Sequence, residues 1–293
     1  MLHRLVCLIV TCTALAWSLG AGAAAPPPAR VSYLRYQAVP ADKARLDTAI
    51  AQFRRGAVSV DLIGAIHVGD GTYYRDLNAR FRGYDRVLFE LVKPEEFDMR
   101  QFSRAEGTVS GLQRAIKDLL ALEFQLDHIN YRARNLVHAD MDSERLGERL
   151  RQHAGDILGS LLVWSVGDAA RLQHADGSVR WTTWELVQAM TDADRPRALK
   201  RLLGRELSEM EVGLGDVGGF GFGSVLIAER NAVAVRVLEK TLAGKSAKKI
   251  AIFYGAAHLP DLAARLVRLG FVPGPVNWVT AWNLAPPRSK ERQ

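Results

Sequence analysis

Two segments near opposite ends of the chain share one order of apolar and polar positions. In the first segment, the apolar run of residues 58–67 (VSVDLIGAIH) predicts a strand. Residues 72–84 (TYYRDLNARFRGY) have the spacing of an amphipathic helix that ends at Gly83, and residues 86–92 (RVLFELV) predict a second strand. The spacing is that of a parallel strand–helix–strand crossover.

The second segment repeats this order near the C-terminus. A strand is predicted over residues 248–255 (KKIAIFYG), a helix over 260–270 (PDLAARLVRLG), and a β-rich stretch over 271–284. In both segments a Gly-x-x-His motif follows the first strand, and a glycine beside an aromatic residue follows the helix. The pattern therefore predicts a pseudo-repeat of two similar units.

Between these units, helical patterns dominate from about residue 110 to 210. Helices are predicted over residues 111–129, 143–153, 156–172 and 195–210, with a short strand in 135–141 and a further helix from Ser224 to about 242. The expected fold is therefore α/β, with a mixed sheet core built from both chain ends and a mostly helical middle insertion.

The first residues have the pattern of an export signal. Arg4 precedes an apolar run over residues 5–17, which is short for a bilayer span of about 20 residues, and Ala21-Gly22-Ala23 fits a cleavage site. We expect a signal peptide at 1–23, a leading segment at 24–56, an α/β domain at 57–285 and a tail at 286–293. The protein is then exported, periplasmic or secreted, without a transmembrane helix beyond the signal segment.

The cysteine content and the charge of the chain exclude some kinds of chemistry and of partner. Cys7 and Cys12 both lie in the predicted signal peptide, so the mature chain has no disulfide, thiolate metal site or cysteine nucleophile. The full chain has 39 Lys and Arg against 32 Asp and Glu, a net charge of +7, which becomes +6 once Arg4 is removed with the signal peptide. Basic and acidic residues are interspersed, so nucleic acid is not an expected partner.

Familiar nucleotide and hydrolase motifs do not fit. GLGDVG, at residues 213–218, matches the dinucleotide fingerprint but follows a helical pattern instead of a strand. We expect the glycine-rich stretch 213–223 to form a flexible loop or lid. The chain has no Gly-x-Ser-x-Gly and no His-Glu-x-x-His, which disfavours familiar serine hydrolases and helix-borne zinc peptidases.

The histidines of the two motifs, His67 and His258, are the first candidate site residues. In open α/β sheets, ligands bind beyond the carboxyl ends of the strands. Imidazoles at the ends of adjacent strands can share one ion, because neighbouring strands lie about 4.8 Å apart. Gly64 and Gly255 lack a Cβ and permit a close backbone approach. Alternatively, each histidine is an ordinary hydrogen-bonded residue at a strand end.

Glu90 lies among apolar residues in the strand predicted over 86–92. A buried carboxylate needs a cation, a metal ion or a proton. Together with His67 and His258, Glu90 would give three protein ligands and an open position, which is the arrangement of a catalytic metal.

Arg230 falls in the middle of the apolar face of the helix that starts at Ser224, with Asn231 at the edge of that face. A guanidinium directed into a core meets carboxylates or an anionic ligand. Two roles stay open, a structural pair with Glu90 and a place in a ligand-facing site, and we expect the second. Tyr74 and Asp140 are further candidates for substrate binding, although Tyr74 also suits a core and Asp140 a helix cap.

The motifs GAIHVGD, FE, AERNAV and GAAHL, spread over about residues 57–285, resemble the TraB/TIKI family, which includes GumN-type bacterial proteins. The resemblance implies an α/β fold with one shared site and, in TIKI members, a metal-dependent peptidase supported by manganese or cobalt. One departure is HLPD after the second motif, where relatives often have a glycine. The matching positions are Gly64, His67, Glu90, Arg230, Asn231, Gly255 and His258.

These inferences converge on an exported metal-dependent hydrolase that acts on peptide or protein substrates. His67, Glu90 and His258 would hold a divalent metal that polarises a carbonyl or activates water. Arg230 would stabilise developing negative charge. Three alternatives stay open: a haem- or metal-binding module without turnover, a metal-free esterase with a histidine general base, and an inactive signalling or inhibitory protein.

Overall fold

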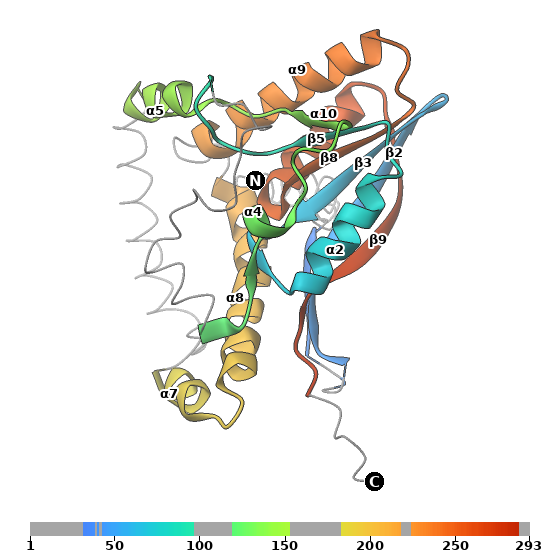
Figure 1. Ribbon diagram of the computed structural model, residues 1–293. Coiled ribbons are helices and arrows are strands. Elements are labelled where there is room, and N and C mark those ends of the chain that lie inside the picture. Colours follow the sequence, from blue (N-terminus) through green and yellow to red (C-terminus); the bar gives the residue numbers. More distant parts are fainter. Residues whose placement is uncertain are drawn as a thin grey trace, which may run out of the picture. The chain divides into compact units, whose positions relative to one another are not determined.

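The computed structural model (Figure 1) describes residues 32–38, 40, 43–96, 119–152, 183–217 and 224–286. These residues all belong to one compact unit, Ser32–Gln293. The predicted signal peptide, the apolar helix predicted over 156–172 and the tail from residue 287 lie outside the described residues. None of the helices described is long and apolar enough to cross a membrane.

A seven-stranded mixed sheet forms the centre of this unit and confirms the predicted fold class. Its path runs β1-β2-β3-β8-β5-β7, and β9 pairs with β2. β3, β8, β5 and β7 are parallel to one another, whereas β1, β2 and β9 pair antiparallel. The bounds are β1 Leu34–Gln37, β2 Arg45–Arg55, β3 Val58–Ala65, β5 Arg86–Phe89, β7 Leu136–His138, β8 Lys249–Gly255 and β9 Val272–Asn283.

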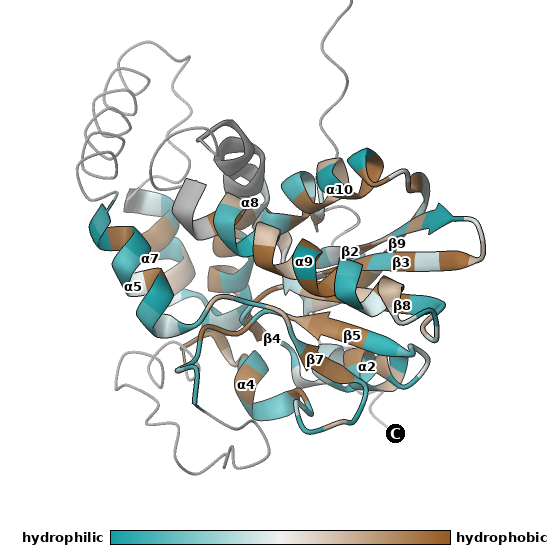
Figure 2. Cartoon of the chain, turned by 90° about the horizontal axis from the view of Figure 1, so that it is seen from above, coloured by the Kyte–Doolittle hydropathy of each residue, from teal (hydrophilic) through white to brown (hydrophobic). Residues whose placement is uncertain are grey.

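Helices cover both faces of the sheet (Figure 2). On one face, Tyr73, Leu77 and Phe81 of α2 join a core that includes Phe253 of β8. On the other face, Leu238 of α9 and three leucines of α10 join a second core with alternate residues of β3 and β8. This alternation is expected for strands buried on both faces. The helices are α2 Gly71–Phe81, α9 Arg230–Ala243 and α10 Leu259–Arg268.

Smaller elements complete the described part of the chain. β4 (Val68–Gly69) and β6 (Glu123–Phe124) form a separate two-stranded sheet. The remaining elements are α4 Gln125–His128, α5 Ser143–Gln152, α7 Thr183–Thr191, α8 Arg195–Val217, the π-helix η3 Ser224–Glu229 and the 3-10 helix η4 Ala256–His258.

The domain starts earlier than the predicted boundary at residue 57. β1 and β2 lie within the segment 24–56 and belong to the central sheet. β2 has β9 on one edge and β1 and β3 on the other, so its apolar residues are buried by strands from both ends of the chain. The leading segment that precedes the sheet therefore ends by Ser32.

Two predictions in the helical middle are wrong. The helix predicted over 111–129 does not run through its described part, because Ala121 has a φ of +48° and β6 then pairs with β4. The loop predicted over 213–223 also fails for residues 213–217, which continue α8. Glycine weakens a helix by about 1 kcal/mol per residue without forbidding it. Residues 218–223 lie outside the described residues.

Candidate functional site

The four parallel strands each deliver one candidate residue to the same edge of the sheet. His67 follows β3, His258 follows β8, Glu90 follows β5 and Asp140 follows β7. β3 and β8 are neighbours, so the two Gly-x-x-His motifs follow adjacent parallel strands. These residues therefore converge at the carboxyl ends of the strands, where α/β folds bind ligands.

The first motif is held through its backbone. The hydroxyl of Tyr73 donates to the carbonyl of Gly64 (2.9 Å), and the hydroxyl of Tyr74 donates to the carbonyl of Ile66 (3.1 Å). His67 is exposed, and its imidazole makes no hydrogen bond to a residue that the structure describes. The turn is thus fixed while the imidazole stays accessible.

The second motif is held through its histidine side chain. His258 is 5 % exposed, and its Nδ1 lies 2.7 Å from Oδ1 of Asn231. Nδ2 of Asn231 donates to the carbonyl of His258 (3.1 Å) and to Oδ2 of Asp261 (2.8 Å). Because both neighbours of Nδ2 are acceptors, the network assigns the oxygen of the amide to the imidazole. Neutral His258 then carries its proton on Nδ1, and Nε2 presents a lone pair.

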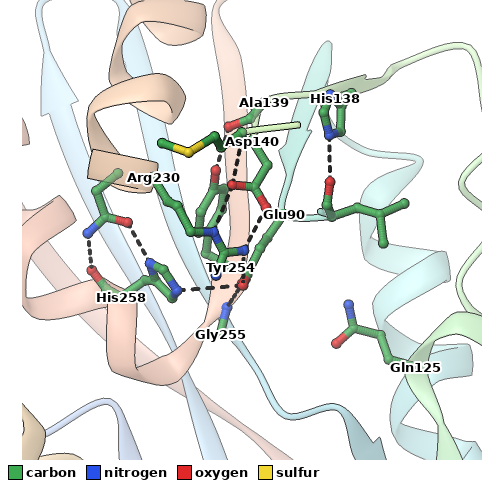
Figure 3. Close-up of polar contacts among 12 residues, drawn as sticks. Glu90, Gln125, His138, Ala139, Asp140, Arg230, Tyr254, Gly255 and His258 are labelled. Carbon is green, nitrogen blue, oxygen red and sulfur yellow. Dashed lines mark hydrogen bonds and ion pairs between the residues drawn. The ribbon is translucent and has the colours of Figure 1, made fainter. Parts of the chain in front are cut away.

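Glu90 faces that lone pair (Figure 3). Its Oε1 lies 3.5 Å from Nε2 of His258 and accepts a hydrogen bond from Nη2 of Arg230 (2.6 Å), while Oε2 accepts from the backbone N–H of Gly255 (2.6 Å). The sequence predicted Glu90 inside a strand. β5 ends at Phe89 instead, so the carboxylate lies at the strand end, where polar groups from other elements reach it.

Arg230 joins Glu90 to Asp140 (Figure 3). Its Nε and Nη2 donate to the two oxygens of Asp140 at 3.0 and 2.6 Å, and the residue is 9 % exposed. Nη1 makes no hydrogen bond to a residue in the described ranges. Two buried carboxylates, Glu90 and Asp140, share the single guanidinium of Arg230. With both carboxylates ionised, these three residues carry one negative charge more than they carry positive charges.

The network shifts the pKa values of Glu90 and His258. Burial alone would raise the pKa of Glu90, but His258, Arg230, the N–H of Gly255 and His67 together lower it below its usual value. Burial lowers the pKa of His258, and Arg230 and His67 add to this effect against the attraction of Glu90. His258 is therefore neutral near neutral pH, and Arg230 is the permanent cation that keeps Glu90 ionised.

Three residues assigned to substrate binding from sequence have partners within the protein. Asn231 is fully buried behind His258, and Asp140 is bound by Arg230. Tyr74 is fully buried against the first motif, and its ring stacks on His128 with centroids 5.7 Å apart. Their substrate contacts stay predictions, whereas their observed contacts are those of residues that orient the site.

Several residues of this region are absent from the sequence-based site. The hydroxyl of Tyr254 donates to the carbonyl of Ala139, and its ring packs edge-on against His258. The buried side chain of Gln125 donates to the hydroxyl of Tyr131 (2.8 Å), but its Oε1 has no partner among the described residues. Asp261 is a third such residue: its Oδ2 accepts hydrogen bonds from Asn231 (2.8 Å) and Arg265 (2.6 Å). Its place in the HLPD sequence that follows the second Gly-x-x-His motif was the available signal.

Among the described residues, no group of three or more His, Cys, Asp or Glu side chains has an arrangement that could hold a metal ion. The charge of His67 nevertheless acts on the pKa of both Glu90 and His258, so the three predicted ligands share one electrostatic environment.

Comparison with known proteins identifies no relative: no family model, curated protein or solved structure matches this chain.

Proposed function

We propose that this protein is a hydrolase whose reaction centre lies between His258 and Glu90. One observation carries the proposal: Nε2 of His258, with its lone pair, lies 3.5 Å from an oxygen of an ionised Glu90. Two electron-rich atoms at this distance repel each other unless a cation or a proton lies between them. The shortage of one positive charge around Arg230 also favours a cation there.

The pair suits a divalent metal ion. With metal–ligand bonds of about 2.1 Å, neighbouring ligands of a tetrahedral site lie about 3.4 Å apart, close to the observed 3.5 Å. Nδ1 of His258 is bound by the Asn231 amide, as the second nitrogen of a metal-ligating histidine usually is. His67, exposed on the neighbouring turn, is the third ligand that we propose; its side chain would have to turn toward the pair, because the three residues as they lie do not form a metal-binding group. A bound divalent ion would supply Lewis acidity toward a carbonyl oxygen or water.

The residues of the chain have separate roles in this proposal. Asn231 keeps the proton of His258 on Nδ1 and so keeps Nε2 available. The N–H of Gly255 and the guanidinium of Arg230 hold Glu90 in its ionised form. Nη1 of Arg230 is the donor left to meet an oxyanion of the substrate.

A peptide or protein substrate is proposed from the TraB/TIKI resemblance of the two Gly-x-x-His motifs, Glu90 and the Arg230–Asn231 pair. Export is proposed from the apolar run at residues 5–17 and the Ala21-Gly22-Ala23 sequence. Sequencing the N-terminus of protein recovered outside the cytoplasm tests export; we expect it near Ala24.

The hydrolase proposal is tested by measuring metal content and peptide cleavage together. We expect about one divalent ion per chain and cleavage of a peptide library that stops after chelation and returns with manganese or cobalt. His258→Ala removes a ligand and should abolish both. Arg149→Ala, at a surface ion pair with Glu229, is the matched control and should change neither. Cleavage that is unaffected by chelation would overturn the metal role.

That same outcome would support a second candidate, a metal-free esterase or amidase with His258 as general base. The lowered pKa of His258 and its fixed Nδ1 proton favour this candidate, because a neutral imidazole with an open Nε2 can accept a proton from water. In this case His258→Ala abolishes turnover, whereas His67→Ala leaves most of it. The two histidine variants therefore separate the two mechanisms.

A further inference from the structure

We propose that Asp261 is a positioning residue that determines, through Asn231, which ring nitrogen of His258 carries the proton. The inference deepens the proposed function, because only one of the two neutral forms of His258 presents a lone pair to the reaction centre. Neither the motifs nor the family resemblance assigned a role to Asp261.

The Asn231 amide is the link between the carboxylate and the imidazole. Asn231 is fully buried, and its amide lies between His258 on one side and Asp261 on the other. Its Nδ2 donates to Oδ2 of Asp261 (2.8 Å) and to the carbonyl of His258 (3.1 Å). A flipped amide would direct its oxygen at these two acceptors, which is strongly unfavourable beside a carboxylate.

Without Asp261, the other neutral form of His258, which carries its proton on Nε2, would be favoured by Glu90. A proton on Nε2 would point at Oε1 of Glu90, 3.5 Å away, and would be attracted by that negative charge. Nδ1 would then become an acceptor, and a flipped Asn231 could donate to it. Glu90 and Asp261 therefore favour different tautomers of His258. In this structure, the Asn231 amide has the orientation that Asp261 requires.

Arg265 fixes Asp261 in this role. Its Nε donates to the same Oδ2 that receives the Asn231 hydrogen bond (2.6 Å), and its Nη2 donates to the carbonyl of Ala228 (3.0 Å). Ala228 belongs to the π-helical turn η3, directly before Arg230. π-Helical turns are frequent at functional sites because they redirect side chains and release carbonyl groups. One arginine thus ties the carboxylate to the turn that places Arg230 and Asn231.

The tautomer of His258 can be observed by ¹⁵N NMR of the full chain labelled at histidine, in protein free of added metal. The chain contains seven histidines, and the spectrum of His258→Gln identifies the resonance concerned. In the wild type we expect a protonated Nδ1 and an unprotonated Nε2. In Asp261→Ala the ratio of the two tautomers should shift toward Nε2–H by at least about tenfold, the change expected for losing a hydrogen bond to a charged group.

Two further variants keep the test decisive. Asp261→Asn retains an acceptor oxygen beside Arg265, so it should keep most of the wild-type tautomer and also serves if Asp261→Ala folds poorly. Glu148→Ala removes a carboxylate that accepts an i,i+4 side-chain bond on α5, and it should leave His258 unchanged. Where turnover is measurable, Asp261→Ala should lower kcat by about tenfold with little change in KM.

The result for Asp261 does not depend on the result for the hydrolase. A wild-type proton on Nε2, or an Asp261→Ala spectrum identical to that of the wild type, would overturn the role of Asp261 even in an active enzyme. A protein without hydrolytic activity that shows the expected tautomer shift would overturn the proposed function and retain the positioning role.

Discussion

His67 and His258 follow neighbouring parallel strands in the same Gly-x-x-His motif, yet the protein holds them differently. Around His67, tyrosines of α2 bind the carbonyl groups of the turn, and the imidazole is exposed. Around His258, Asn231 binds the imidazole itself, which is buried. One motif therefore presents an accessible imidazole, whereas the other presents a fixed one.

The residues after each histidine explain this difference. His67 is followed by Val68–Gly69, which pair with β6 before α2 begins at Gly71. His258 is followed at once by α10, with a proline in the first helical positions. A proline there favours immediate helix formation. Three residues, Val68 to Asp70, thus separate the first histidine from its helix, whereas none separates His258 from α10. The His67 side of the proposed site is therefore exposed, and the His258 side is buried and held in place.

The largest effect on stability should come from Arg230, which contacts the network around His258 and, within the described residues, makes no contact with His67. Arg230→Met leaves Glu90 and Asp140 buried without their cation, which should cost about 3–5 kcal/mol. For a domain of this size, that corresponds to a fall in melting temperature of roughly 6–20 °C. Thermal unfolding followed by circular dichroism measures it.

The control for this variant is Arg149→Met. Arg149 pairs with Glu229 at 2.6 Å on the surface, where solvent screening leaves an ion pair little effect on stability. The sequence favoured a ligand-facing Arg230 whose loss leaves stability nearly unchanged. If Arg230→Met and Arg149→Met melt at the same temperature, Arg230 faces a ligand site as the sequence suggested. The guanidinium of Arg230 then does not stabilise the buried network around His258.

The next effect compares the two histidines directly. His258→Ala leaves the buried Oδ1 of Asn231 without its donor, which should destabilise the protein by about 1–3 kcal/mol. His67→Ala removes an exposed side chain and should change stability by no more than about 0.5 kcal/mol. Urea denaturation measures both. Equal losses would show that the two turns are held in the same way.

Sequence patterns predicted the placement of the histidines because that placement depends on local periodicity and on the parallel crossover. They did not predict that Asp140 shares Arg230 with Glu90, since these residues come from three elements brought together only by the sheet. The pairing of β4 with β6 was missed because two-residue strands have no detectable period. The domain start was misplaced because β9, one partner of β2, lies more than 200 residues away.

A smaller effect is expected from the motif glycines. A Cβ on Gly255 would lie 3.3 Å from Oε2 of Glu90, so the carboxylate must shift by a few tenths of an ångström. A Cβ on Gly64 would lie 3.4 Å from Ala49 and Leu259, away from the reaction centre. The backbone of Gly255 (φ −49°, ψ 140°) suits alanine, so Gly255→Ala should keep the wild-type melting temperature.

Metal affinity or turnover should therefore fall by about tenfold in Gly255→Ala, and less in Gly64→Ala, because small displacements of a catalytic group are costly. Titration with manganese and steady-state kinetics measure the two effects. A larger loss in Gly64→Ala would place the sensitive side of the site at the first motif.

The smallest effect lies at the opposite end of β8, away from both histidines. Oδ2 of Asp85 accepts the backbone N–H groups of Lys248 and Lys249, at 2.7 and 2.9 Å, where that strand begins. These hydrogen bonds, first that of Lys249 and then that of Lys248, lower the pKa of Asp85 below its usual value of 3.8.

A carboxyl group with a lowered pKa in the folded state contributes stability above its unfolded pKa. That contribution is lost as the pH falls through the folded value. Asp85→Asn should therefore melt slightly below the wild type at neutral pH, and the difference should shrink in acid and disappear once the pH is below the lowered pKa of Asp85. Melting curves across this range measure it. A difference that persists at low pH would mean that Asp85 contributes through packing, and that strand β8 is fixed at its start by something other than this carboxylate.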